Sequence, residues 1–312
     1  MLNNLTVSPA PHISSGQTTQ KIMFKVVLAL LPAGLAGIYI FGLSSLRVML
    51  ISIVSCVMSE AIFLKLRKRD PRAVLDGSAL LTGLLIAYNL PPEVPFWLPI
   101  VGGCVSIVIG KQIFGGLGHN IFNPALVGRV FLHISWPLYM TTWKNPRWAV
   151  DAVSTATPLA NEGARGFTYM DLFLGNHGGC IGEVCIAALL IGAAFLIFTK
   201  IISWHIPVSF MGTAMFLAWI FGGDGFFNGD FIFHLLAGGL VMGAFFMATD
   251  YVTRPLTRMG KIIFGIGCGV LTAVIRLKGS YPEGVSYAIL FMNAMVPLID
   301  RYTKTRKYGF IK

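Results

Sequence analysis

The sequence predicts an all-α polytopic membrane protein with about ten transmembrane helices. Of its 312 residues, 55% are hydrophobic and only 12% are charged, whereas a soluble domain is about 25% charged. The mean hydropathy is +0.73. The apolar residues also come in blocks of roughly 17–25 residues, the length that a helix needs to cross a bilayer. Such a chain has too few polar residues to cover a surface in water, so a soluble fold is excluded.

Ten apolar blocks are expected to cross the membrane, in two groups of five. The expected crossings are 22–43, 46–64, 78–90, 96–114, 120–137, 182–200, 204–222, 231–249, 261–277 and 284–300. The third, ninth and tenth are short for isolated spans, so tilted, broken or protein-buried helices are expected there. The resulting segments are a cytoplasmic N-terminal tail (1–21), a first five-helix half (22–137), an extracytoplasmic loop (138–181), a second five-helix half (182–300) and a basic cytoplasmic tail (301–312).

The positions of the basic residues predict the orientation. With a cytoplasmic N-terminus, 17 of the 24 Lys and Arg residues fall in inside segments and Arg129 falls within a span. The six outside are Arg47, Lys144, Arg147, Arg165, Arg276 and Lys278. This bias agrees with the positive-inside rule. Both termini are therefore expected in the cytoplasm, and the net charge of +11 is explained by the membrane without a nucleic-acid partner.

The two halves share a weak internal likeness. The first half contains segment 83–88, Pro91 and segment 102–104, and the second half contains the similar segment 243–248, Pro255 and segment 267–269 in the same order. Duplicated units with an odd number of spans insert in opposite senses, which predicts a five-plus-five inverted repeat. The alternative is a chance alignment of glycine-rich apolar sequence.

Few residues in the chain have the spacing of a known site. The six histidines are far apart and form no HExxH motif, and no GxxxxGK[ST] loop is present, so neither a metal ligand nor a catalytic residue is assigned. Asn123-Pro124 is typical of a helix start. Asp76 is expected to cap the third span, and Asp250 to cap a helix end or pair with Arg254.

The extracytoplasmic loop contains a short run of hydroxylated residues closed by a proline. The run is Asp151-Ala-Val-Ser-Thr-Ala-Thr157-Pro. From the residues alone it indicates a turn or a helix cap, or hydroxyls that a phosphate could esterify.

The run matches the pattern D-x-x-[ST]-x-A-T at Asp151, Ser154, Ala156 and Thr157. With this match the chain resembles the NqrB/RnfD family of flavinylated membrane proteins. That family contains the RnfD component of Rnf ion-translocating electron-transport complexes and the NqrB component of sodium-translocating NADH:quinone reductases. Three further blocks, 75–84, 118–129 and 246–255, resemble the same family. The sequence departs from the pattern at Ala152 and Thr155, where glycine is usual, so the resemblance is weaker at those positions.

The resemblance implies FMN attached through a phosphoester on Thr157 by an FAD-dependent flavin transferase. The short N-terminal tail favours the Rnf branch, in which the partners would be Rnf subunits A, B, C, E and G and the lipid of a bacterial cytoplasmic membrane. Such a complex couples electron transfer between ferredoxin and NAD to Na⁺ or H⁺ translocation. A second, non-covalent flavin such as riboflavin is implied by analogy. The alternatives are the NqrB component of the quinone reductase and an inverted-repeat solute channel or transporter.

Overall fold

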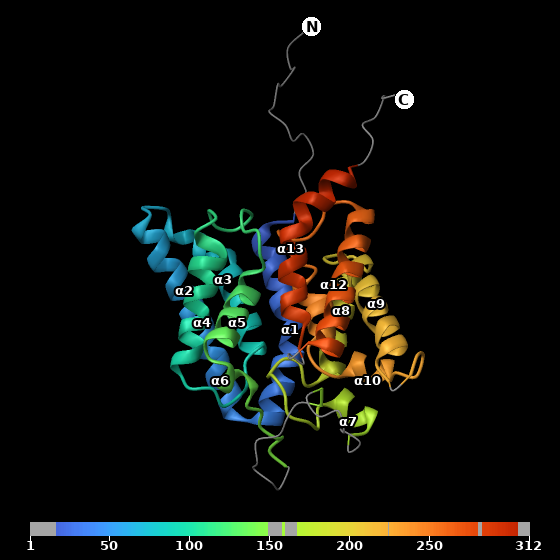
Figure 1. Cartoon of the computed structure of the whole chain (residues 1–312). Helices are drawn as coiled ribbons and strands as arrows, with labels where there is room; N and C mark the ends of the chain where they lie inside the picture. The colour runs from blue at the N-terminus through green and yellow to red at the C-terminus, as the bar shows by residue number, and fades with distance from the viewer. Residues whose placement is uncertain (1–16, 149–157, 160–166, 224, 280–282, 305–312) are drawn as a thin grey trace, which may run out of the picture.

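The computed structural model describes residues 17–148, 158–159, 167–223, 225–279 and 283–304. Within these ranges the repeating secondary structure is helical throughout (Figure 1). The prediction of an all-α fold is confirmed.

The first half begins with two long helices and continues with shorter ones. Its elements are α1 (Thr19–Phe41), α2 (Leu43–Leu66), the 3-10 helix η1 (Pro71–Asp76), α3 (Ser78–Tyr88), α4 (Trp97–Ile107), the π-helix η2 (Val108–Gln112), α5 (Pro124–Ser135) and α6 (Pro137–Thr141). The expected helix start is confirmed, because the Asn123 side chain accepts the Ala125 N–H and Pro124 takes the first helical position. Asp76 also acts at a helix start, where its carboxylate accepts the Ser78 N–H at 2.8 Å.

Helix α7 (Tyr169–Leu174) lies in the segment that the sequence predicts to be the extracytoplasmic loop. The helices of the second half are α8 (Ile186–Phe198), α9 (His205–Phe221), α10 (Phe231–Leu236), α11 (Leu240–Met242), the π-helix η3 (Gly243–Met247), α12 (Arg258–Lys278) and α13 (Val285–Tyr302). Helix α1 begins and α13 ends at the same end of the molecule, which we name the terminal end (Figure 1). Helices α6, α7 and α10 lie at the opposite end, which we name the loop end (Figure 1).

Three helices, α1, α2 and α12, are long and apolar enough to cross a membrane. The 23 residues of α1 rise about 35 Å, compared with about 30 Å for the hydrocarbon core of a bilayer. Large apolar side chains on these helices face outward, among them Leu35 and Leu50, which are 66% and 54% exposed. Five shorter apolar helices of 10–17 residues accompany them. The chain is a multi-pass membrane protein.

The expected crossing 231–249 is not one helix. It divides into α10, α11 and η3, and the break lies at Ala237–Gly239. Gly238 has φ +71°, a left-handed conformation that a right-handed helix does not contain and that glycine adopts without a steric penalty. The third expected crossing likewise ends at Tyr88, and its 11 residues rise only about 17 Å. These two elements, one from each half, therefore end inside the protein.

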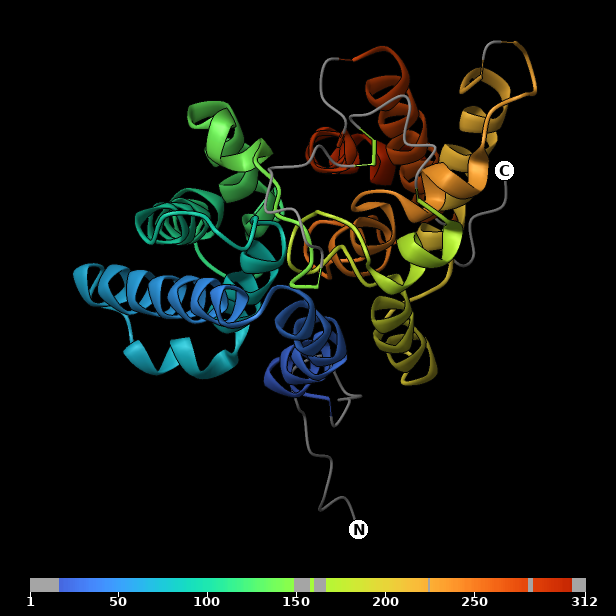
Figure 2. The same ribbon diagram turned by 90° about the horizontal axis from the view of Figure 1, so that it is seen from below.

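The two halves lie side by side and share one apolar core (Figure 2). Helices α1 and α8 approach so closely that a Cβ on Gly192 would lie 2.0 Å from the Ala29 carbonyl oxygen. The contact therefore requires glycine, as is common where membrane helices pack backbone to backbone.

Candidate functional site

The four residues of the loop motif, Asp151, Ser154, Ala156 and Thr157, lie outside the described residues. Pro158, the next residue along the chain, is buried. The Cδ1 atom of Leu159 lies 2.7 Å from the point that a Cβ on Gly238 would occupy. The residues directly after the motif are therefore held against the break between α10 and α11.

A buried arginine on α5 joins the two halves near this break. The Arg129 guanidinium donates to the Glu183 carboxylate at 3.1 Å, and it also donates to Glu283 and to the Asn89 side-chain oxygen. The side chains of Arg129, Glu183 and Glu283 are 8%, 4% and 13% exposed. An arginine at this depth is stable only with such partners. The cluster is therefore an ion-paired link between the first half and the segments that precede α8 and α13.

A buried segment before α8 positions Glu183. The Ile181 N–H donates to the Leu90 carbonyl at 3.1 Å, and the Gly182 N–H donates to the Tyr88 carbonyl at 3.0 Å. Carbonyls at the end of α3 would otherwise have no partner in the interior. The Tyr88 hydroxyl in turn donates to the Leu30 carbonyl at 2.7 Å. The short α3 helix, its carbonyl partners and Glu183 thus form one unit.

The carboxylates of this cluster and a nearby cysteine are close enough to form a metal site. One ligand atom from each of Cys180, Glu183 and Glu283 lies within 4.8 Å of the others. However, Arg129 contacts all three, including the Cys180 sulfur at 3.9 Å. The guanidinium already supplies a cation to the group. We therefore interpret it as an arginine-bound carboxylate pair.

A second arginine reaches the same break from α12. Arg276 Nη1 donates to the His234 carbonyl at 2.6 Å, and Nη2 donates to the Ala237 carbonyl at 3.2 Å. Its Nε is buried without a hydrogen-bond partner. A buried N–H of this kind is available to an acceptor that the chain itself does not supply.

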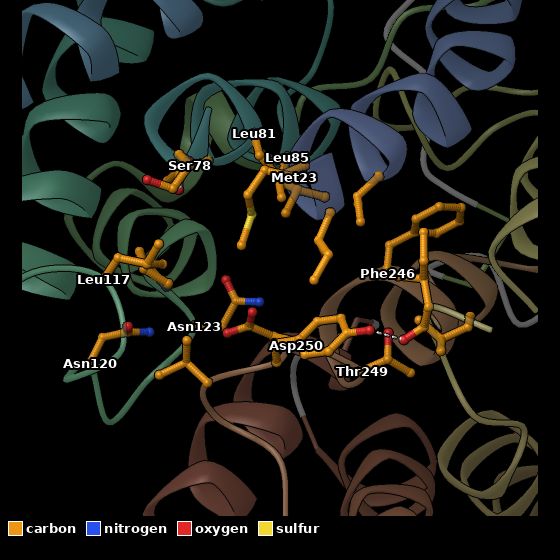
Figure 3. A pocket seen from close by; sticks show the side chains of 18 of the residues that line it. Met23, Ser78, Leu81, Leu85, Leu117, Asn120, Asn123, Phe246, Thr249 and Asp250 are labelled. Atoms are coloured by element: carbon orange, nitrogen blue, oxygen red, sulfur yellow. Dashed lines mark hydrogen bonds between the residues drawn. The ribbon is translucent and has the colours of Figure 1, made fainter. Parts of the chain in front are cut away.

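A pocket at the terminal end is lined by α1, α3, the start of α5 and the end of η3 (Figure 3). Met23, Leu81 and Leu85 lie on one side of it, opposite Asn123 and Asp250 (Figure 3). A further lining residue, Asn120, has a buried side-chain oxygen without a partner. Apolar walls with a few convergent amide and carboxyl groups are typical of a small-molecule site.

Asp250 does not form an ion pair with Arg254, which was one of the two roles expected for it from the sequence. Its carboxylate accepts the Thr253 hydroxyl at 3.1 Å, while the Arg254 guanidinium lies 4.3 Å from the centre of the Tyr251 ring. A cation over an aromatic face is stable without a carboxylate. Burial raises the pKa of Asp250 above the ordinary aspartate value.

A buried lysine on η2 forms part of the pocket wall. Lys111 donates to the Glu60 carboxylate at 2.5 Å and to the Ser78 hydroxyl at 2.6 Å. Gln112 donates to the same Glu60 oxygen at 2.6 Å. The lysine and the glutamate are 2% and 3% exposed. The terminal end therefore contains a complete ion pair of its own.

The sequence identified only part of these sites. It placed Arg129 within a span, but did not single out Glu60, Lys111, Glu183 or Arg276 as functional candidates. Each of these four lies inside or near the end of an expected crossing, and ionisable residues at membrane depth are functional candidates by default. The sequence alone could therefore have identified these four residues as candidates, but it could not have shown which of them form pairs.

The fold and these sites define an all-helical membrane protein in which buried charged groups connect two helical halves. Residues 6–309 match the model of the NQR2, RnfD, RnfE family, and the chain belongs to that family. The resemblance drawn from the sequence is confirmed.

The similar proteins are all named as D subunits of ion-translocating oxidoreductase complexes. The chain is 48% identical over 321 residues to the D subunit of the proton-translocating ferredoxin:NAD(+) oxidoreductase complex of Clostridium ljungdahlii, covering 98% of this chain and 97% of the relative. It is 48% identical over 315 residues to the D subunit of the Na(+)-translocating ferredoxin:NAD(+) oxidoreductase complex of Acetobacterium woodii, covering 99% and 96%. It is 41% identical over 327 residues to the D subunit of the ion-translocating oxidoreductase complex of Stutzerimonas stutzeri, covering 94% and 92%.

Proposed function

We propose that this chain is the covalently flavinylated RnfD component of an Rnf-type ferredoxin:NAD oxidoreductase complex, in which electron transfer drives Na⁺ or H⁺ translocation. The observation that carries the proposal is near full-length similarity, at 48% identity, to two proteins named as that component. Those two relatives are named for different ions, so overall similarity does not select the ion. The match over 96–97% of their length also favours RnfD over the NqrB component of the quinone reductase.

The residues around the motif fit a flavin phosphate on Thr157. Pro158 and Leu159 follow Thr157 and are held at the break between α10 and α11, where Arg276 has a buried Nε without a partner. When bound, FMN supplies the redox chemistry, and the protein supplies position and electrostatics. Asp151, Ser154 and Ala156 would serve as the recognition motif of the flavin transferase.

The pocket at the terminal end is the proposed site of the second flavin, such as riboflavin. Its apolar walls suit a planar ring system, and the unpartnered Asn120 oxygen suits a ring N–H donor. Because no covalent acceptor is proposed there, this flavin would leave the protein on denaturation.

The proposal keeps the ten expected crossings, and helix packing supports the inverted repeat. Helix α2 packs on α4 as α9 packs on α12, and α4 packs on α5 as α12 packs on α13. Helices α1 and α8 contact one another across the two halves, as do α5 and α13. This pairing is expected of two units related by a pseudo-twofold axis.

The proposed location is the bacterial cytoplasmic membrane, with both termini in the cytoplasm and the flavin loop outside. The charge bias of the sequence and the shared end of α1 and α13 support this orientation. The proposed partners are Rnf subunits A, B, C, E and G, the flavin transferase and membrane lipid.

The test is to express the complex together with its flavin transferase and to separate the denatured subunits on a gel. We expect flavin fluorescence on this chain and none on Thr157→Ala, because the phosphoester needs that hydroxyl. Acid extraction of the Thr157→Ala complex should still release the second flavin. Peptide mass spectrometry that found FMN on Ser154 or Thr155 would overturn the assignment, and a wild-type chain without covalent flavin would favour a channel or transporter.

A further inference from the structure

Helices α9 and α12 begin side by side at the terminal end, where α13 ends (Figure 1). A Cβ on Gly265 would lie 1.9 Å from the Ser209 hydroxyl oxygen, and a Cβ on Gly269 would lie 2.7 Å from Thr213 Cβ. Because these contacts follow the same order along both helices, the helices are parallel. Both therefore present the positive ends of their dipoles to one surface, and neither has an acidic residue in its first turn.

The surface at these two helix starts is strongly basic. It is formed by segments 199–205, 250–261 and 300–304, which contain six Lys and Arg residues and two Asp residues, a formal net charge of +4. The segments are joined by hydrogen bonds from the Tyr251 hydroxyl to the Ile201 carbonyl and from the start of α12 to the end of α13. The cations are Lys200, Arg254, Arg258, Lys261, Arg301 and Lys304.

Neither aspartate neutralises this basic surface by a direct ion pair. Asp250 accepts the Thr253 hydroxyl at 3.1 Å, and Asp300 accepts the Leu256 N–H at 3.1 Å. Among the residues that the structure describes, the ion pairs include none of the six cations. The cations also lie close together, since the charges of Arg254 and Arg258 both act on Lys261. Such like charges repel one another unless an anion lies between them.

Three polar side-chain atoms of the basic surface are buried without a hydrogen-bond partner. They are Arg254 Nη1, Ser203 Oγ and His205 Nδ1. The Arg254 guanidinium lies 4.3 Å from the centre of the Tyr251 ring, and that contact does not use the Nη1 hydrogens. Helix α9 also lacks a side-chain cap, because its N-cap residue is Trp204, so its first N–H groups need other acceptors. An anion with several oxygen atoms would supply acceptors to these donors.

An apolar stripe on α12 leads away from the basic surface. Met259, Ile263, Ile266 and Val270 are all exposed, and their spacing of three or four residues places them on one face of the helix. Trp204 is exposed at the start of α9, and a tryptophan at a helix end is typical of the membrane interface. The cations therefore lie at headgroup level, next to a surface that suits acyl chains.

We propose that the starts of α9 and α12 bind an anionic phospholipid of the leaflet at the terminal end. Its phosphate accepts hydrogen bonds from Arg254, Arg258 and Lys261, and its acyl chains lie along the apolar stripe of α12. A phosphate matches both the guanidinium fork and the helix N-termini. A zwitterionic lipid suits the site less well, because its ammonium group cancels the attraction of the basic surface. The inference does not depend on the flavin.

The test uses the complete complex in phosphatidylcholine nanodiscs that contain a small share of phosphatidylglycerol with a photoreactive diazirine in its acyl chain. After illumination, we expect mass spectrometry to find lipid cross-linked to peptides of α9 and α12. Excess ordinary phosphatidylglycerol should remove these cross-links, whereas phosphatidylcholine and inorganic phosphate should not. Removal by inorganic phosphate would show that the site takes a soluble phosphate. Absence of the cross-links from the complex would show that another subunit covers the surface, and either result would overturn the proposal.

Variants test the role of the cations. Arg258→Gln combined with Lys261→Gln should lower the phosphatidylglycerol cross-links several-fold and leave those of a photoreactive phosphatidylcholine unchanged. The matched control is Lys65→Gln combined with Lys68→Gln. It removes the same charge from exposed positions at the C-terminal end of α2, where the helix dipole does not favour an anion, and should leave the cross-links unchanged. An equal loss in both double variants would show only a general attraction to basic residues and would refute the site. If the α12 double variant does not assemble, Arg258→Gln alone is compared with Lys65→Gln.

Discussion

The terminal end contains a buried cation, Lys111, and the loop end contains a half-buried one, Arg276, and the two cations have different partners. At the terminal end, Lys111 meets Glu60 from α2 at 2.5 Å. At the loop end, Arg276 meets only backbone carbonyls, because the corresponding helix α9 contains no acidic residue. Lys111 is therefore neutralised by a direct ion pair, whereas Arg276 is balanced without direct contact by Glu183 and Glu283.

This difference concerns how each end neutralises its charge. The terminal-end pair neutralises its own charge, so its pocket suits a neutral molecule that enters and leaves. At the loop end, the charges of Arg129 and Arg276 together balance those of Glu183 and Glu283, so neutrality depends on four side chains from separate segments. Variants at the two ends test this contrast, and they are taken in order of decreasing effect.

The largest loss of stability is expected from Arg129→Met. The substitution leaves Glu183 and Glu283 buried without their cation, and removing one partner of a buried pair costs about 3–5 kcal/mol. The measurement is thermal unfolding of the purified complex in lipid nanodiscs. Arg47→Met, at an exposed position, serves as the control and should change stability by no more than about 0.5 kcal/mol. Equal melting temperatures for the two variants would show that the cluster is not a structural link.

Lys111→Met should destabilise the chain by a smaller amount, about 3 kcal/mol, because it strands one carboxylate. Replacing both members of the pair, with Glu60→Met added, should recover most of that loss, since well-packed apolar residues often substitute for a buried ion pair without net cost. Stability of the single and double variants would be compared by the same unfolding assay. If the double variant is less stable than Lys111→Met, Glu60 has a role beyond neutralising the lysine.

The smallest expected effect is the pH dependence of local stability around Asp171 at the loop end. Hydrogen bonds from Thr168 and Asn176 lower the pKa of its carboxyl below the ordinary value. A lowered pKa stabilises the fold at pH values above the unfolded pKa, about 3.9, and this contribution is lost as the pH falls through the folded value. Hydrogen exchange in α7, corrected for intrinsic rates, should therefore stay constant from about pH 7 to pH 5 and accelerate below about pH 4. Asp171→Asn should show fast exchange already at neutral pH, and equal protection of both chains would contradict the prediction.

The sequence predicted the helical class, the family and the helix start at Asn123 because each depends on local pattern. It did not predict the break at Gly238, because hydropathy treats Ala237-Gly238-Gly239 as part of an apolar block and has no information about φ. The ion-paired cluster was also missed. Arg129 is 54 residues from Glu183 and 154 from Glu283, and a single sequence carries no signal for contacts at that separation. The flavin motif at Thr157 stays a prediction, because it lies outside the described residues.

The join between the first two helices has a consequence for how the chain enters the membrane. Helix α1 ends at Phe41 and α2 begins at Leu43, so Gly42 is the only residue between two apolar spans, and its φ of +82° suits glycine. The link offers almost no polar backbone that must be carried across the bilayer on its own. We therefore expect the two spans to leave the insertion machinery together, ahead of the shorter helices that pack against them.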